Sequence, residues 1–137
     1  EVPNRAYGYS QIDGRWQRTD QSTTSAVLGD GGIYSSIDDL AKWDAALYDQ
    51  RLLKASSLQL AFSPATATKE PDVPFYGFGW RINGDALWHS GESIGFRNVI
   101  VRYPKQKLTV IVLSNRNEPE PYALAIDIAR RWLDAAR

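Results

Sequence analysis

The chain has 137 residues, which suits a single domain with a core of its own. Its 16 basic and 16 acidic side chains cancel, so it lacks the basic excess needed to bind nucleic acid or an anionic membrane surface. It contains no cysteine, which excludes disulfides and thiolate metal sites, and no apolar run approaches the roughly 18 residues of a membrane-spanning helix. Since it also contains no methionine, even at position 1, we expect a piece of a longer protein or a processed product.

The first third of the chain predicts a hairpin, a loop and a helix. Residues 6–18 form two short runs around Asp13-Gly14, a strong two-residue turn signal. Residues 19–28 are polar and predict a loop, and the glycine-rich residues 29–32 predict a turn before the helix. They do not predict a phosphate-binding loop, because no Lys-Ser/Thr follows them. Ser36 and Asp39 predict an N-terminal helix cap. The apolar face of the helix then consists of Ile37, Leu40, Trp43 and Leu47.

The rest of the chain predicts a short helix, a loop, a β meander and a final helix. We expect Ser56 or Ser57 to cap the short helix, which runs through Leu60. Residues 63–75, with three prolines, predict a solvated connecting loop, with a loop at the border of a substrate cleft as the alternative. Short connections make the following strands antiparallel neighbours. We expect strands over 76–82, 86–90, 96–103 and 107–114 and a helix over 121–136. The last strand is apolar on both faces, so the final helix should cover one face and the first helix part of the other.

His89 is the only histidine, and it lies in the sequence His89-Ser90-Gly91 directly after a strand-like run. A lone histidine beside a tryptophan in a strand is most often structural, but a single imidazole is also the first candidate for chemistry near neutral pH. The five tryptophans could form a sugar-binding platform. Because at least three fall at core-facing positions, we interpret them as core residues.

Four segments, in this order and spacing, resemble the serine β-lactamase-like and penicillin-binding-protein-like hydrolases. This family includes class C β-lactamases, D-alanyl peptidases, D-aminopeptidases and esterases. The segments are residues 31–43 (GGIYSSIDDLAKW), 76–80 (YGFGW), 89–91 (HSG) with 95–97 (GFR), and 110–115 (VIVLSN). The resemblance implies an α+β fold, in which an antiparallel sheet with packed helices forms the C-terminal part of a β-lactamase/transpeptidase-like fold.

The resemblance also implies the roles of four candidate catalytic residues on an edge strand. His89 would be the basic residue of the family's third active-site motif, and the Ser90 hydroxyl would hydrogen-bond substrate. Gly91 would leave room for substrate along the strand, and the backbone N–H of Glu92 would be an oxyanion-hole donor. Ser90 is not the expected nucleophile, because no base is spaced to serve it.

The chain departs from the family pattern in lacking both Ser-x-x-Lys and Tyr-x-Asn, which supply the nucleophile, its base and a phenol. We therefore expect residues 1–137 to be a single C-terminal segment of such a hydrolase, inactive alone and without a cofactor. The intact enzyme would act on an ester, amide or β-lactam, in the periplasm or outside the cell. We expect the segment to self-associate through apolar surface. The alternative is a non-catalytic β-rich module that binds a ligand or a partner chain.

Overall fold

The computed structural model describes residues 2–20 and 31–136 and has the predicted α+β architecture. The predicted loop at 19–28 and the glycine-rich turn at 29–32 lie largely outside the described residues. The helices are α1 (Ile37–Ala46), α2 (Ala55–Ala61) and α3 (Tyr122–Ala135). The strands are β1 (Tyr9–Ile12), β2 (Arg15–Arg18), β3 (Thr66–Glu70), β4 (Val73–Tyr76), β5 (Arg81–Asn83), β6 (Ala86–Ser93), β7 (Phe96–Tyr103) and β8 (Leu108–Ser114).

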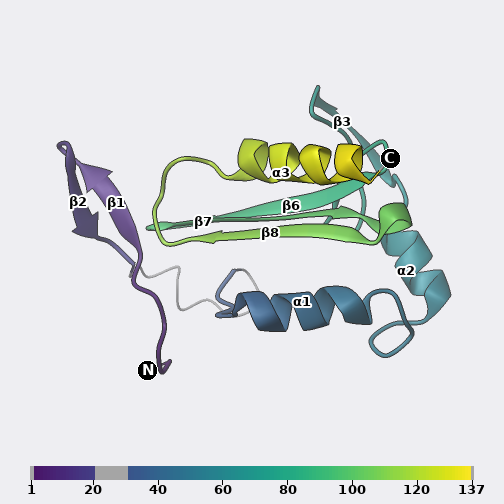
Figure 1. Ribbon diagram of the computed structural model, residues 1–137, viewed down its shortest axis with the longest axis horizontal. Helices are drawn as coiled ribbons and strands as arrows, with labels where there is room; N and C mark the ends of the chain where they lie inside the picture. The colour runs from purple at the N-terminus through teal and green to yellow at the C-terminus, as the bar shows by residue number, and fades with distance from the viewer. Residues whose placement is uncertain (1, 21–30, 137) are drawn as a thin grey trace.

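The main sheet has six antiparallel strands whose spatial order, β3-β4-β5-β6-β7-β8, is their order in the chain. Helix α3 lies along one face of this sheet and α1 along the other, which gives three layers (Figure 1). Strands β1 and β2 form a separate hairpin beyond one end of the sheet (Figure 1). Both predicted covers of the sheet are therefore present.

The α3 face of the sheet carries the larger apolar cluster. Ala125 and Ala129 of α3 are fully buried, and their small side chains let the helix backbone approach the strands closely. Tyr122, at the start of α3, stacks on Trp88 of β6 with the ring centroids 3.9 Å apart. The buried strand residues of this cluster are Val73, Trp88, Val99, Val101 and Val110.

The opposite face combines a second apolar cluster with a buried ion pair. Arg102 of β7 has no exposed surface, and its Nε donates a hydrogen bond to the carboxylate of Asp44 on α1. The hydroxyl of Thr109 on β8 donates to the same carboxylate over 3.0 Å. Polar contacts therefore fix α1 to this face. The buried apolar residues of the cluster are Leu47, Leu58, Trp80, Ile82 and Leu87.

The prediction of a loop over 63–75 was wrong, because β3 and β4 form a hairpin within it. Three prolines argue against strands, but two of them, Pro64 and Pro71, lie outside the strand bounds. Pro74 lies within β4 at a register shift, where it faces no paired residue. Its missing N–H therefore removes no ladder hydrogen bond.

The prediction of one strand over 76–82 was also wrong, because the chain turns between β4 and β5 at residues 77–80. Gly77 N–H donates to the carbonyl of Trp80 over 2.7 Å. Gly79 has a φ of 77°, a conformation that favours glycine. An apolar run rich in glycine thus formed a tight turn between two short strands.

Three smaller predictions about helices and tryptophans have mixed outcomes. Ser36 caps α1 as predicted and accepts from the N–H of Asp39 over 3.2 Å. Helix α2 begins at Ala55 without a side-chain cap, so the predicted serine cap was wrong. Only two tryptophans, rather than at least three, belong to the buried core. Trp80 and Trp88 are buried, whereas Trp16, Trp43 and Trp132 are 45%, 41% and 51% exposed.

Candidate functional site

The four candidate residues all lie in the second half of β6, where the sheet is paired on one side only. Strand β7 pairs with β6 along its length, from Leu87 to Ser93. Strand β5 pairs only with residues 86–88 of β6. The expectation of an edge strand was wrong for β6 as a whole, since β6 lies between β5 and β7. Within the described part of the chain, however, residues 89–93 have no strand partner on the β5 side, because β5 is too short to reach them.

His89 is half-buried and has one side-chain hydrogen-bond partner among the described residues. Its Nε2 lies 3.0 Å from the hydroxyl oxygen of Tyr76, the last residue of β4. The two rings meet edge to face, with their centroids 6.1 Å apart. The imidazole is therefore held by a phenol at the open part of β6.

Ser90 receives a hydrogen bond from a cation. Nη1 of Arg81, on β5, donates to the Ser90 hydroxyl oxygen over 3.1 Å. The same guanidinium lies over the Trp88 ring, 4.6 Å from its centroid. Among the described residues, the side-chain hydrogen-bond partner of the Ser90 hydroxyl is thus a cation and not a general base. Sequence reasoning missed Arg81, because only the strand register brings it beside Ser90.

Gly91 faces open space, since a Cβ built on it would meet no atom of the described chain within 4 Å. Its φ lies outside the left-handed region, so neither packing nor backbone conformation requires glycine here. Gly95, in the β6–β7 turn, is different: its φ is 77° and an added Cβ would lie 2.5 Å from the carbonyl carbon of Gly8. Within the described chain, the position beside Gly91 is therefore open.

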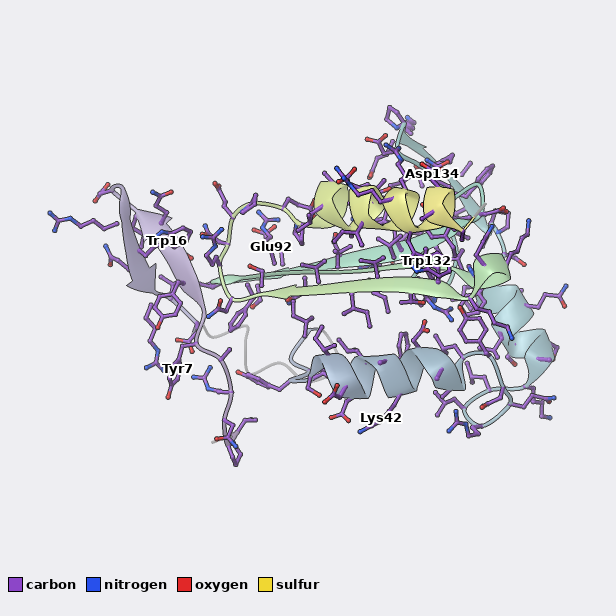
Figure 2. The ribbon with its side chains drawn as sticks, viewed as in Figure 1. Tyr7, Trp16, Lys42, Glu92, Trp132 and Asp134 are labelled. Carbon is purple, nitrogen blue, oxygen red and sulfur yellow. The ribbon has the colours of Figure 1, made fainter. Side chains whose placement is uncertain are left out.

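Glu92 lies opposite Arg97 at the end of the β6–β7 hairpin, and its carboxylate forms an ion pair with Arg97 Nη1 over 2.6 Å. Figure 2 shows Glu92 toward the end of the sheet nearest Tyr7 and Trp16 of the N-terminal segment. Arg97 Nε also donates to the carbonyl of Asn117 over 2.9 Å. The side chain of Glu92 is thus engaged with the protein, and the resemblance assigns the oxyanion role to its backbone N–H.

The N-terminal hairpin is attached to this end of the sheet. Tyr9 N–H donates to the carbonyls of Gly95 and Asn115 over 3.2 and 3.0 Å. The side-chain amide of Asn115 donates to the carbonyl of Tyr7 over 3.0 Å. Turn residues Asp13 and Gly14 have φ values of 51° and 73°, as a two-residue hairpin turn requires, so the predicted hairpin is confirmed.

A buried carboxylate, that of Asp20, ties the N-terminal residues to the end of this hairpin. Asp20 is 5% exposed and accepts hydrogen bonds from Arg5 and Arg18 over 2.6 and 2.9 Å. Burial raises the pKa of Asp20, but the hydrogen bonds from Arg18 and Arg5 outweigh burial, so its pKa lies below the ordinary value. The two arginines in turn lie over the Tyr7 ring, at 4.8 and 3.5 Å from its centroid.

These features can be compared with those of known proteins. A family model described as Beta-lactamase matches residues 1–133. The chain belongs to this family. It is 34% identical over 105 residues, which is 73% of this chain, to penicillin-binding protein 4* of Bacillus subtilis (strain 168). The resemblance found from the four sequence segments is therefore confirmed.

A solved structure shows the same fold. The crystal structure of a penicillin-binding protein from Bacillus halodurans superposes with a TM-score of 0.79 over 97% of this chain, at 24% identity. The family member described here spans 42% of that chain and 23% of the length of the Bacillus subtilis relative. No helix in the described residues is long and apolar enough to cross a membrane.

Proposed function

We propose that this Beta-lactamase family chain supplies the substrate-facing strand of a serine hydrolase that acts through an acyl-enzyme on an ester, amide or β-lactam. The observation that carries the proposal is the open edge of β6. There His89, Ser90 and Gly91 lie together on a stretch that, among the described strands, pairs with β7 alone. A backbone edge with an unfilled position beside it suits a substrate that lies along the strand.

Each of the four residues has a distinct role in this proposal. The His89 imidazole polarises the reacting group or moves a proton, and the Ser90 hydroxyl, held by Arg81, hydrogen-bonds a substrate carbonyl or carboxylate. Gly91 leaves space for the substrate chain. The Glu92 backbone N–H stabilises the oxyanion of the tetrahedral intermediate. The nucleophile and its base come from a Ser-x-x-Lys outside these 137 residues.

The partners follow from the same proposal. The ligand of the intact enzyme is a small or peptide-like acyl compound, and the intact enzyme acts in the periplasm or outside the cell. The 137 residues alone are inactive, because they contain neither Ser-x-x-Lys nor Tyr-x-Asn.

Two assays on purified protein test the proposal. The 137-residue chain and the full-length protein that carries it are each given a nitrophenyl ester and a chromogenic cephalosporin. The full-length protein should turn over one of them and gain the mass of the acyl group on an upstream serine, whereas the chain alone should do neither. A full-length sequence without Ser-x-x-Lys would overturn the proposal and favour a binding module.

Variants of His89 in the full-length protein test the role of the imidazole. His89→Ala should lower kcat/KM by roughly a hundredfold or more, the usual contribution of one acid–base group. His89→Lys should retain more activity than His89→Ala, because a cation at this position matches the lysine of the β-lactamase branch. Melting temperatures measured on the same proteins separate catalysis from folding. Unchanged kcat/KM in a destabilised His89→Ala would assign His89 a structural role.

A further inference from the structure

The contact between Tyr76 and His89 has a further consequence for the chemistry of the imidazole. Tyr76 Oη lies 3.0 Å from His89 Nε2, so this ring nitrogen is occupied. Within the described chain, Nδ1 forms no hydrogen bond, which leaves it as the ring nitrogen available to a ligand. The proton of a neutral imidazole resides on one nitrogen only, and the partner of the other nitrogen decides which.

The local fold holds Tyr76 firmly in place. The carbonyl of Tyr76 accepts from the N–H of Ala65 over 3.2 Å. In the ladder Tyr76 pairs with Thr66 of β3 on one side and with Arg81 of β5 on the other. A strand residue paired on both sides has little freedom in its backbone, so its hydroxyl is presented to His89 in one position.

The turn that follows Tyr76 is also fixed by close contacts. A Cβ on Gly77 would lie 2.5 Å from the carbonyl oxygen of Ala61, at the end of α2, so only glycine fits there. Phe78 N–H donates to that same carbonyl over 3.1 Å. Trp80, at the end of the turn, is buried in the second apolar cluster. The Tyr-Gly-Phe-Gly-Trp segment therefore places the phenol beside the imidazole through packing at both of its ends.

We propose that Tyr76 is a positioning residue for His89: its hydroxyl donates to Nε2 and thereby places the ring proton on Nδ1, the nitrogen left free. A phenol is a much stronger hydrogen-bond acid than a neutral imidazole N–H, and an imidazole nitrogen is a stronger acceptor than a phenol oxygen. The direction from O–H to Nε2 is therefore favoured. No covalent bond is made or broken, and the proton stays on the phenol oxygen.

In its neutral form, an imidazole positioned in this way gives the site a hydrogen-bond donor that carries no full charge. With the proton on Nδ1, the imidazole can donate to a carbonyl, a carboxylate or a leaving group, as a lysine ammonium would at the same position. This part of the inference rests on the proposed function. The tautomer itself does not, since it is a property of the folded 137-residue chain.

Nitrogen-15 NMR of this chain tests the tautomer directly, because His89 is the only histidine and its ring signals are unambiguous. Above the titration range of the imidazole, the shifts of Nδ1 and Nε2 and their couplings to the ring protons identify the protonated nitrogen. Wild type should show mainly protonated Nδ1. A histidine side chain free in water prefers protonated Nε2, so Tyr76→Phe should shift the population toward that form.

Tyr103→Phe is the matched control, because Tyr103 is another half-buried strand tyrosine and its hydroxyl forms no hydrogen bond within the described chain. This variant should leave the ring shifts of His89 unchanged. Protonated Nε2 as the main form in wild type would overturn the proposal without any variant. So would equal tautomer populations in wild type and a folded Tyr76→Phe.

The tautomer proposal and the proposed function can fail independently of each other. If His89→Ala leaves kcat/KM of the full-length protein unchanged, the catalytic role of His89 fails, whatever the tautomer. If the tautomer is wrong while His89→Ala abolishes activity, the positioning role of Tyr76 fails and the proposed function stands.

Discussion

Arg102 Nε donates its hydrogen bond to Asp44, a residue 58 positions earlier in the chain, and the guanidinium has no exposed surface. Its Nη1 and Nη2 are buried without a hydrogen-bond partner in the described chain. They lie instead among the rings of Tyr48, Phe62 and Trp80, with the guanidinium carbon 4.9 to 5.5 Å from the ring centroids. Asp44 is therefore the one carboxylate that balances this charge among the described residues.

Asp44→Ala should destabilise the fold by about 3–5 kcal/mol, because it leaves a buried guanidinium without its counter-charge. Urea unfolding followed by circular dichroism measures the loss. Asp49→Ala is the control, since Asp49 forms an exposed pair with Arg51 and should leave the free energy of unfolding nearly unchanged. Equal stabilities of the two variants would show that Asp44 does not hold α1 on the sheet.

The depressed pKa of Asp20 predicts that the folded chain loses stability in acid. Its pKa is depressed in the folded chain, so its contribution is fully present above the ordinary value of 3.8 and is lost as the pH falls through the lower folded value. Asp20→Asn should therefore be less stable than wild type at pH 7, and the difference should shrink below about pH 4. Unfolding curves at several pH values measure it, and a difference that stays constant down to pH 2 would contradict the assignment.

Gly91→Ala and Gly95→Ala form a pair with opposite expectations. Gly91→Ala should leave the melting temperature nearly unchanged, since the added methyl group meets no described atom. Gly95→Ala should lower it clearly, because the residue has a positive φ and the methyl group would collide with Gly8. Should Gly91→Ala keep full activity in the full-length protein, the space beside β6 would not belong to the substrate.

Helix α3 carries a stripe of exposed apolar residues. Leu124, Ile128 and Trp132, spaced by four residues, are 55%, 42% and 51% exposed. We propose that the isolated chain self-associates through this stripe, with a second copy as the partner. Light scattering at high concentration should show an oligomer in wild type and a smaller species in Ile128→Lys. Asp127→Lys, on the same helix, is the control. A strictly monomeric wild type would refute self-association.

Local patterns predicted much of the fold, and tertiary contacts account for what they missed. The Asp13-Gly14 turn, the capped helix at Ser36 and the final helix depend on neighbours a few residues apart, so the sequence alone indicated them. The sequence did not predict the β3–β4 hairpin, because proline argues against a strand. Pro74 is tolerated there because it lies at a register shift, where it has no paired residue. Ile37 and Trp43, on the predicted apolar face of the first helix, are 47% and 41% exposed, so helical spacing overestimates how much of a helix surface becomes buried.

The candidate site was predicted through family resemblance, and its supporting contacts were not. His89, Ser90 and Gly91 follow one another in the sequence, so a motif could identify them. Tyr76 ends β4 and Arg81 begins β5, on either side of the turn at residues 77–80. That turn brings the Tyr76 hydroxyl to His89 and the Arg81 guanidinium to Ser90. The spacing of residues in the sequence does not indicate how β4, β5 and β6 pair.

The sheet grows in chain order, so each strand can add to the one made just before it, and only short loops need to close. The N-terminal hairpin differs, because the amide of Asn115 reaches the carbonyl of Tyr7 across 108 residues. Long loop closure is slow and entropically costly, so this contact should form last. Hydrogen exchange should accordingly find the amide of Tyr9 less protected than that of Val101. Opening of the hairpin would then uncover the turn at Gly95 while the six-stranded sheet, with His89 on it, stays folded.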